Sequence, residues 1–89
     1  MVTVILSHEV ANVAEWRVGF DGHEPVRQQA GVKTLGVYQS VDNPNQISII
    51  TEFPSAVAVA GFFSDPNMKA QFAKAGVIGV PEAKILNKI

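Results

Sequence analysis

The sequence contains no cysteine, so neither disulfide bonds nor thiolate metal sites can supplement its hydrophobic core. It also lacks an excess of charge of one sign: seven basic and eight acidic residues are spread along 89 residues, with a formal charge of −1. No cluster of basic residues matches a phosphate backbone, which argues against nucleic acid as a ligand. We expect a single domain, residues 1–89, burying only about 60 to 65 % of its unfolded surface. Such a domain needs good packing or a partner subunit.

Long hydrophobic runs are missing as well. The longest apolar run, residues 57–63, is interrupted by Gly61 and is far shorter than the ~20 residues of a membrane-spanning helix. The opening segment "MVTVILSHEV" lacks the basic region and the small-residue cleavage site of a signal peptide. We therefore expect no membrane association and a cytoplasmic location.

Four segments have the composition of β-strands. Residues 2–8, "VTVILSH", are β-branched and aliphatic, which favours a strand buried on at least one face. Residues 32–41 and 46–53 are two further strand-like runs, and the intervening "DNPN" favours a tight connection between them, hence a hairpin. Residues 82–89, "EAKILNKI", are expected to form a short closing strand.

A first helix is predicted between the first two strands. Asn12 can accept a hydrogen bond from the first helical N–H groups, so the helix should span about 13–30. Gly31 then offers the left-handed conformation that closes a helix. Pro25 lacks the N–H that would bond to Asp21, which predicts a kink or break near this position.

A second helix should begin after Ser55, a candidate N-cap. The segment "SDPN" interrupts it, because Asp65 can cap and Pro66 fits the first position of a fresh helical segment. Gly76 should end that segment as Gly31 ends the first helix.

The order β-α-β-β-α-β predicts an α+β, ferredoxin-like fold: an antiparallel sheet with two helices on one face. "QQAGV" and "AKAGV" each close a helix before a strand region, as expected of two βαβ halves. The other face of the sheet would carry Thr3, Ile5 and Ser7, which are not a charged, solvated set. Two such faces packed together in a homodimer would bury both.

The sequence also resembles a known superfamily. A Trp and a Phe on the first helix, "AGV" at its end, "GVYQSVDNPNQ" leading into "ITEFPS", and "FFSDPNMKAQFAKAGVIGVPE" together resemble the dimeric α+β barrel proteins. Within that superfamily the chain is most similar to small bacterial proteins related to antibiotic-biosynthesis monooxygenases and to stress-responsive barrel proteins. The resemblance covers nearly the whole chain and implies a pocket between helices and sheet.

The resemblance does not supply a catalytic set. Members of the superfamily include cofactor-free oxygenases, haem-degrading enzymes, cyclases, isomerases, lyases and proteins of no known activity, so the fold does not determine the function. Cofactor-free oxygenases of this group typically place Asn and Trp near the third strand and second helix. Residues 54–76 contain no Trp and, of these two types, only Asn67. They also lack the His that haem-degrading relatives carry on the second helix.

The segment "AEWRVGFDGHEPVRQQAG", residues 14–31, collects most of the chemistry. Trp16, Phe20, His23 and Arg27 are spaced i, i+4, i+7 and i+11, which places them on one stripe of a helix. Trp16 and Phe20 can be core anchors or can line a cavity. At the break, Asp21 and His23 could act together in acid–base chemistry; the alternative is a solvated, charged helix end with a local ion pair.

His8 lies on the same side of its strand as Val2, Val4 and Leu6. If that side faces the helices, His8 points into the cleft with Trp16, and the alternative is a strand-end His that meets solvent. We expect a small, mostly apolar cavity lined by six residues: His8, Trp16, Phe20, Tyr38, Phe62 and Phe72.

Three functional hypotheses remain open. The first is a small enzyme without cofactor that acts on an aromatic or carbonyl-bearing metabolite by proton transfer or oxygenation, with His8 and His23 as acid or base and Asp21 orienting one of them. The second is a non-catalytic ligand-binding or stress-related protein, and the third is a structural dimer whose hollow is filled. We predict no metal site, because two His with Asp21, Glu24 or Glu9 do not form a recognised ligand spacing.

Overall fold

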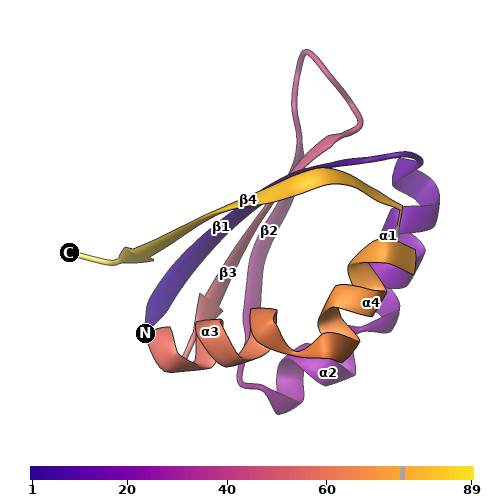
Figure 1. The fold of residues 1–89 in the computed structure, drawn as a ribbon. Helices are drawn as coiled ribbons and strands as arrows, with labels where there is room; N and C mark the ends of the chain where they lie inside the picture. The colour runs from indigo at the N-terminus through magenta and orange to yellow at the C-terminus, as the bar shows by residue number, and fades with distance from the viewer. Residues whose placement is uncertain (75) are drawn as a thin grey trace.

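The protein folds into one four-stranded antiparallel sheet with helices on one face (Figure 1). We describe residues 1–74 and 76–89 of a computed structural model; for residues 71–74, 79 and 80 the description covers the backbone alone. The elements are, in chain order, β1 (Val2–Val10), α1 (Val13–Gly22), α2 (Glu24–Gln29), β2 (Lys33–Gln39), β3 (Gln46–Phe53), α3 (Ala56–Ser64), α4 (Pro66–Lys74) and β4 (Val77–Asn87).

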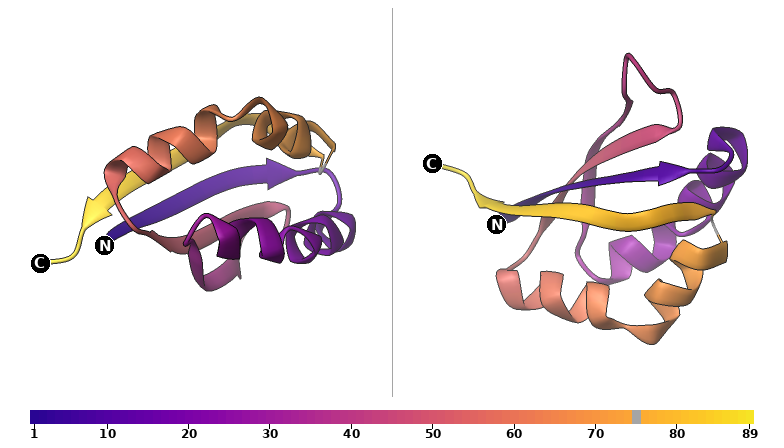
Figure 2. Two further views of the ribbon diagram at one scale, coloured as in Figure 1. Left: turned by 90° about the horizontal axis from the view of Figure 1, so that it is seen from below. Right: turned by 45° about the horizontal axis from the view of Figure 1, so that its top comes forward.

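The strand order is β2-β3-β1-β4, and the three neighbouring pairs are all antiparallel. The ferredoxin-like α+β prediction is therefore confirmed, with each predicted helix present as two consecutive helices. Figure 2 shows two helical arms on the same face of the sheet: α1 and α2 run beside β2 and β3, and α3 and α4 run beside β4. Strand β1, one of the two inner strands, lies between the arms. Within the described residues no helix is long and apolar enough to cross a membrane.

Strand β1 alternates strictly between the two faces of the sheet. Its even-numbered residues are buried beneath the helices, whereas its odd-numbered residues are only half-buried on the open face. The pairing of Leu6 with Ile49 and of Ile5 with Ile50 carries the same division across to β3. On the open face, the hydroxyl groups of Ser7 and Ser48 are hydrogen-bonded at 3.0 Å. The predicted sidedness of this strand is therefore confirmed.

The first helical arm begins and ends as its sequence predicts. The Asn12 side chain accepts a hydrogen bond from the Glu15 N–H at 3.0 Å, and Gly31 adopts a φ of 76° after the last turn. The arm breaks at His23, between α1 and α2. Pro25 explains the break, because it has no N–H to donate to the carbonyl of Asp21.

The second arm follows the same rules. The Ser55 hydroxyl accepts from the Ala58 N–H at 3.1 Å, and the Asp65 carboxylate accepts from the Asn67 N–H at 2.8 Å. Pro66 occupies the first position of α4, where its missing N–H costs nothing. Gly76 adopts a φ of 77°. The predicted interruption at "SDPN" is confirmed.

The closing strand is longer than predicted. We expected a strand over 82–89, but β4 begins at Val77 and pairs with β1 in two registers separated by a bulge. Val77 and Ile78 pair with the end of β1 before the bulge, and pairing resumes at Glu82 opposite Ser7. Gly79 and Pro81 interrupt the strand pattern in the sequence, and a bulge is where a strand tolerates such residues.

Two apolar clusters form the core beneath the sheet. The first contains Val2, Val4, Val32, Phe53 and Val59. The second contains Leu6, Val10, Trp16, Ile47 and Ile49. Phe63 of α3 packs against both clusters, so it links them over the middle of the sheet.

Candidate functional site

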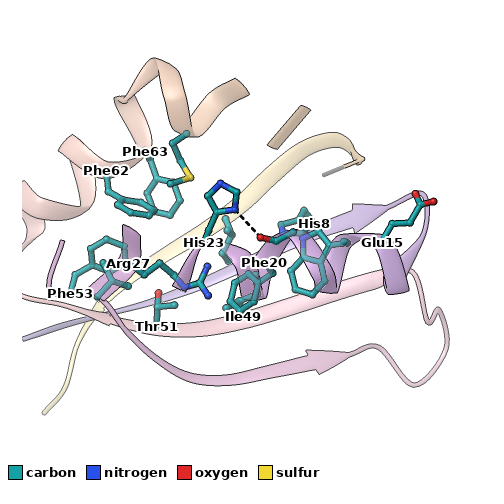
Figure 3. A pocket seen from close by; sticks show the side chains of 15 residues that line it. His8, Glu15, Phe20, His23, Arg27, Ile49, Thr51, Phe53, Phe62 and Phe63 are labelled. Carbon is teal, nitrogen blue, oxygen red and sulfur yellow. Dashed lines mark hydrogen bonds between the residues drawn. The ribbon is translucent and has the colours of Figure 1, made fainter. Parts of the chain in front are cut away.

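A cavity of about 180 Å³ lies between the helices and the sheet, where the two apolar clusters meet (Figure 3). A cavity of ~150 Å³ lined by apolar side chains is large enough to hold benzene, whereas drug-sized ligands need ~300 Å³ or more. The space therefore suits a ligand with one ring. Fifteen residues line it: Leu6, His8, Glu15, Trp16, Gly19, Phe20, His23, Arg27, Val32, Ile49, Thr51, Phe53, Phe62, Phe63 and Met68.

One wall of the cavity is a ladder of four side chains in successive contact. The His8 ring meets the Trp16 ring edge-on at a centroid distance of 5.7 Å. Trp16 stacks on Phe20 at 5.0 Å, and the Arg27 guanidinium carbon lies 3.8 Å from the centroid of the Phe20 ring. The stripe predicted from the sequence therefore persists across the break between α1 and α2, and the ladder joins one strand residue to three from the first arm.

The helix break fixes the orientation of His23. Its backbone N–H donates to the carbonyl of Phe20, three residues back, instead of the carbonyl of Gly19, four residues back. The Gly19 carbonyl instead meets the His23 Nδ1 at 2.8 Å. Because a carbonyl oxygen only accepts hydrogen bonds, Nδ1 carries the hydrogen, and Nε2 is the basic nitrogen of the neutral ring.

Arg27 brings a buried positive charge to the same cavity. The residue is 6 % exposed, and its Nη2 donates to the Glu24 carboxylate at 2.8 Å. The flat face of its guanidinium lies over Phe20, where a cation–π contact stabilises it. Among the described residues, Arg27 Nε is buried and has no hydrogen-bond partner. Leaving such a donor unpaired costs about 1–3 kcal/mol.

His8 lies deep in the site. It is 2 % exposed, and burial lowers the pKa of His8 below its ordinary value, which keeps the imidazole neutral. Strand β1 positions it on the helix-facing side, as the alternation of that strand predicts. The pairing of β1 with β4 changes register between Ser7 and Glu9, so the bulge lies directly opposite His8. Bulges are common beside functional sites, where they re-aim a side chain.

Four of the six predicted lining residues line the cavity: His8, Trp16, Phe20 and Phe62. The side chain of Phe72 lies outside the described residues. The placement of Tyr38 in the cavity is wrong: it is exposed and pairs with Ser48 on the open face. The cause is a bulge in β2, because Thr34 and Val37 both pair with helix-facing residues of β3 and the extra residue reverses the alternation.

The predicted pairing of Asp21 with a histidine is also wrong. The Asp21 carboxylate lies 3.2 Å from Nε of Arg17 in an exposed i,i+4 ion pair, and Asp21 does not line the cavity. His23 takes the Gly19 carbonyl as its partner instead. For Asp21 the alternative prediction, a solvated helix end with a local ion pair, is therefore correct. His23 and Arg27 instead line the cavity.

Sequence reasoning missed several lining residues on β3 and the second arm. Thr51 is the clearest, because it is a polar residue in the buried alternation of Ile47, Ile49 and Phe53. That exception was visible in the sequence. Met68 also lines the cavity, but nothing in the sequence distinguishes it from a packing residue.

The acidic and histidine side chains of the described residues do not converge on a metal site. No group of three or more His, Asp or Glu lies close enough together there to hold a metal ion. The site as described combines one buried neutral His, one oriented His, one buried Arg and a ring-sized apolar space.

Comparisons with known proteins support the fold. No protein-family model matches the sequence, and no curated protein sequence matches it. A solved structure from Bordetella bronchiseptica, described as a candidate antibiotic biosynthesis monooxygenase, superposes with a TM-score of 0.81 at 14 % identity and covers 99 % of this chain and 96 % of that one. A conserved protein from Methanosarcina mazei Go1 has a TM-score of 0.76 at 18 % identity, over 99 % of this chain and 92 % of that one.

A further candidate antibiotic biosynthesis monooxygenase, from Caulobacter crescentus CB15, has a TM-score of 0.73 at 18 % identity and covers 99 % of this chain and 89 % of that one. Identities this low establish a shared fold and leave the activity open. The expected resemblance is confirmed at that level: this chain has the ferredoxin-like α+β fold of the antibiotic-biosynthesis-monooxygenase-like proteins.

Proposed function

We propose that this protein binds a small metabolite with a single aromatic or cyclic carbonyl ring, and that His23 acts on it as a general base. The observation that carries the proposal is the ring-sized cavity with His23 held on its wall by the Gly19 carbonyl. A general base must sit within reach of the proton it removes and must have a free basic nitrogen. The Nδ1 hydrogen bond leaves Nε2 for that task.

The aromatic ladder supports the choice of a ring as ligand. Trp16 and Phe20 offer the ligand rigid aromatic walls, and aromatic pairs are stabilised by ~0.5–1.5 kcal/mol beyond the burial of their area. Apolar side chains of α3 close the opposite wall, including Phe62 and Phe63. A ligand seated against these apolar walls would displace water from the reacting atoms, which strengthens the electrostatic interactions within the site.

The reaction that fits these groups is proton removal. His23 Nε2 takes a proton from a ring hydroxyl, giving a phenolate, or from the carbon beside a carbonyl, giving an enolate. Two structures with this fold are described as candidate monooxygenases, which favours a further step with dioxygen. In that step a ring CH₂ is oxidised and O₂ is reduced, so that R₂CH₂ + O₂ gives R₂C=O + H₂O, with no cofactor consumed.

The general-base role can be tested with cyclohexanone, by following exchange of its α-hydrogens for deuterium in D₂O by ¹H NMR. We expect the protein to accelerate exchange over matched buffer and His23→Gln to lose about 100-fold or more of that acceleration, the lower end of general-base effects. Asp21→Asn is the matched control, because Asp21 is a neighbouring polar residue outside the cavity. Equal rates for the wild type and His23→Gln would refute the general base.

A non-catalytic binding protein is the second candidate. One observation favours it: the carboxylate expected to orient a histidine, Asp21, is paired with Arg17 instead. Cyclohexanone that shifts the NMR signals of the cavity residues without accelerated exchange would establish this function over the first.

We also propose that the protein acts as a homodimer that pairs two open sheet faces. Apolar side chains on this face, including Ile5 and Ile50, are only half-buried, and Leu86 of β4 is exposed beside them. Ser7 and Ser48 bond to each other at the centre of the face, and the charged residues Lys84 and Glu82 of β4 pair with Ile5 and Ser7 at its β4 side. A second copy would cover this surface without touching the cavity on the other face.

A further inference from the structure

The position of Arg27 suits a role in ligand binding better than a purely structural role. Its burial is nearly complete, yet Nε has no hydrogen-bond partner among the described residues, and the residue lines the cavity. Buried polar groups in proteins are overwhelmingly hydrogen-bonded, and an exception calls for a partner. In Figure 3 the guanidinium reaches into the space beside Thr51 and His23, so a bound molecule there is within its reach.

The contacts of Arg27 leave an edge of its guanidinium available. Its face is covered by Phe20 and one Nη2 hydrogen is given to Glu24. An arginine carries five N–H donors in a planar fork, so donors remain on the side of Nε. Stacking on Phe20 holds the plane of the fork fixed, which reduces the entropy lost when a ligand binds.

Glu24 does not neutralise this charge completely. Its side chain is 44 % exposed, so water screens its interaction with the buried guanidinium. Glu15 is the other carboxylate on the cavity wall, and Figure 3 shows its carboxylate directed away from Arg27. The charge that Arg27 brings to the cavity is therefore open to an anion.

We infer that Arg27 binds a carboxylate group of the ligand, so that the cavity selects a single-ring carboxylate such as a benzoate-sized molecule. This inference rests on the proposed binding of a ring in the cavity. A planar carboxylate matches the edge of a guanidinium, and charge-assisted pairs of this kind are about twice as strong as neutral hydrogen bonds. The cavity of about 180 Å³ has room for one ring and one such group.

The test compares benzoate with benzamide, its neutral isostere, by titration against the protein at pH 7 with calorimetry and NMR. We expect the wild type to bind benzoate at least about 10-fold tighter than benzamide. Arg27→Met keeps the apolar stem and should abolish that preference while changing benzamide binding less than about 3-fold. Arg17→Met is the matched control: it removes the same charge from an exposed position outside the cavity, and the preference should remain.

The outcomes separate this inference from the proposed function. If both probes bind the cavity with equal affinity in the wild type, the carboxylate inference is wrong and ring binding stands. If neither probe shifts the signals of the cavity residues, both are wrong. Should Arg27→Met fail to fold, Arg27→Lys decides, because it keeps the charge and removes the planar fork: loss of most of the preference supports the inference, and full retention overturns it.

Discussion

His8 should limit the stability of this fold at mildly acidic pH. The residue is 2 % exposed, and burial lowers the pKa of His8 in the folded protein. In the unfolded chain the imidazole titrates near its ordinary value of ~6.5. Between that pH and the lower pKa of the folded state, the unfolded chain binds one more proton than the folded chain. Stability should therefore be full above about pH 6.5 and decrease as the pH falls through that value towards the folded pKa.

One proton sets the size of the effect. The free energy of unfolding changes by at most about 1.4 kcal/mol per pH unit for a single group of this kind. For a domain of 60–100 residues, 1 kcal/mol shifts Tm by ~4–8 °C. We therefore expect Tm to decrease by as much as about 5–11 °C per pH unit at the steepest part of the profile, which is a large share of the stability of a small domain.

Thermal unfolding followed by circular dichroism from pH 7.5 to 5.5, at one fixed protein concentration, measures this slope. His8→Phe keeps a planar ring in place but cannot titrate, so its Tm should be nearly independent of pH over this range. His23→Gln is the control, because it retains His8 and should retain the slope. Equal pH slopes for the wild type and His8→Phe would refute the argument, since the lost stability would then come from other groups.

Two further predictions concern the backbone and the open sheet face. Gly31→Ala should lower the free energy of unfolding by about 1–2 kcal/mol or more in urea denaturation, because Gly31 has a φ of 76° and an added Cβ would lie 3.0 Å from Pro54 Cγ. Gly22→Ala, where an added Cβ meets nothing within 4 Å, should instead stabilise α1 by about 0.5–1 kcal/mol, and destabilisation by both variants would contradict the conformational explanation. Ile50→Lys should convert the proposed homodimer into a folded monomer in sedimentation velocity, and an unchanged mass would place the interface elsewhere.

Local signals in the sequence predicted the elements of the fold well. Asn12 and Ser55 act as N-caps, Pro25 and Pro66 mark the interruptions, and Gly31 closes the first arm, because each residue acts through its own backbone or a neighbour three or four positions away. Such effects are readable from a linear sequence. The ferredoxin-like arrangement then follows from the order of the elements along the chain.

The errors arose where a side chain's position depends on pairing between distant strands. The sequence places Tyr38 in the cavity, but the bulge between Thr34 and Gly36 turns its side chain to the open face. The length of β4 depends on a bulge opposite His8, and glycine and proline in that region resemble a loop in the sequence. A change of register by one residue moves every following side chain of the strand to the other face of the sheet. One missed bulge therefore misplaces all the residues that follow it.

Part of the site was predictable because it depends on local spacing within one helical segment. The helical spacing of Trp16, Phe20, His23 and Arg27 placed all four on one stripe, and all four line the cavity. The partner of His23 was not predictable, because it is a carbonyl released by the helix break and not a side chain. The burial of Arg27 was likewise hidden, since arginine in a helical end is usually solvated.

The junction at His23 borders the cavity, and the bulge in β4 lies opposite His8, which lines it; neither interrupts the pairing of Val2–Ser7 with the neighbouring strands. Extra residues inserted at either point would reshape the chamber while the paired strands kept their alignment. Irregular segments tolerate inserted residues better than regularly paired strands do. The length of the chain can therefore change at these two points while the paired strands stay unchanged. Related proteins could in this way bind ligands of different size with the same fold.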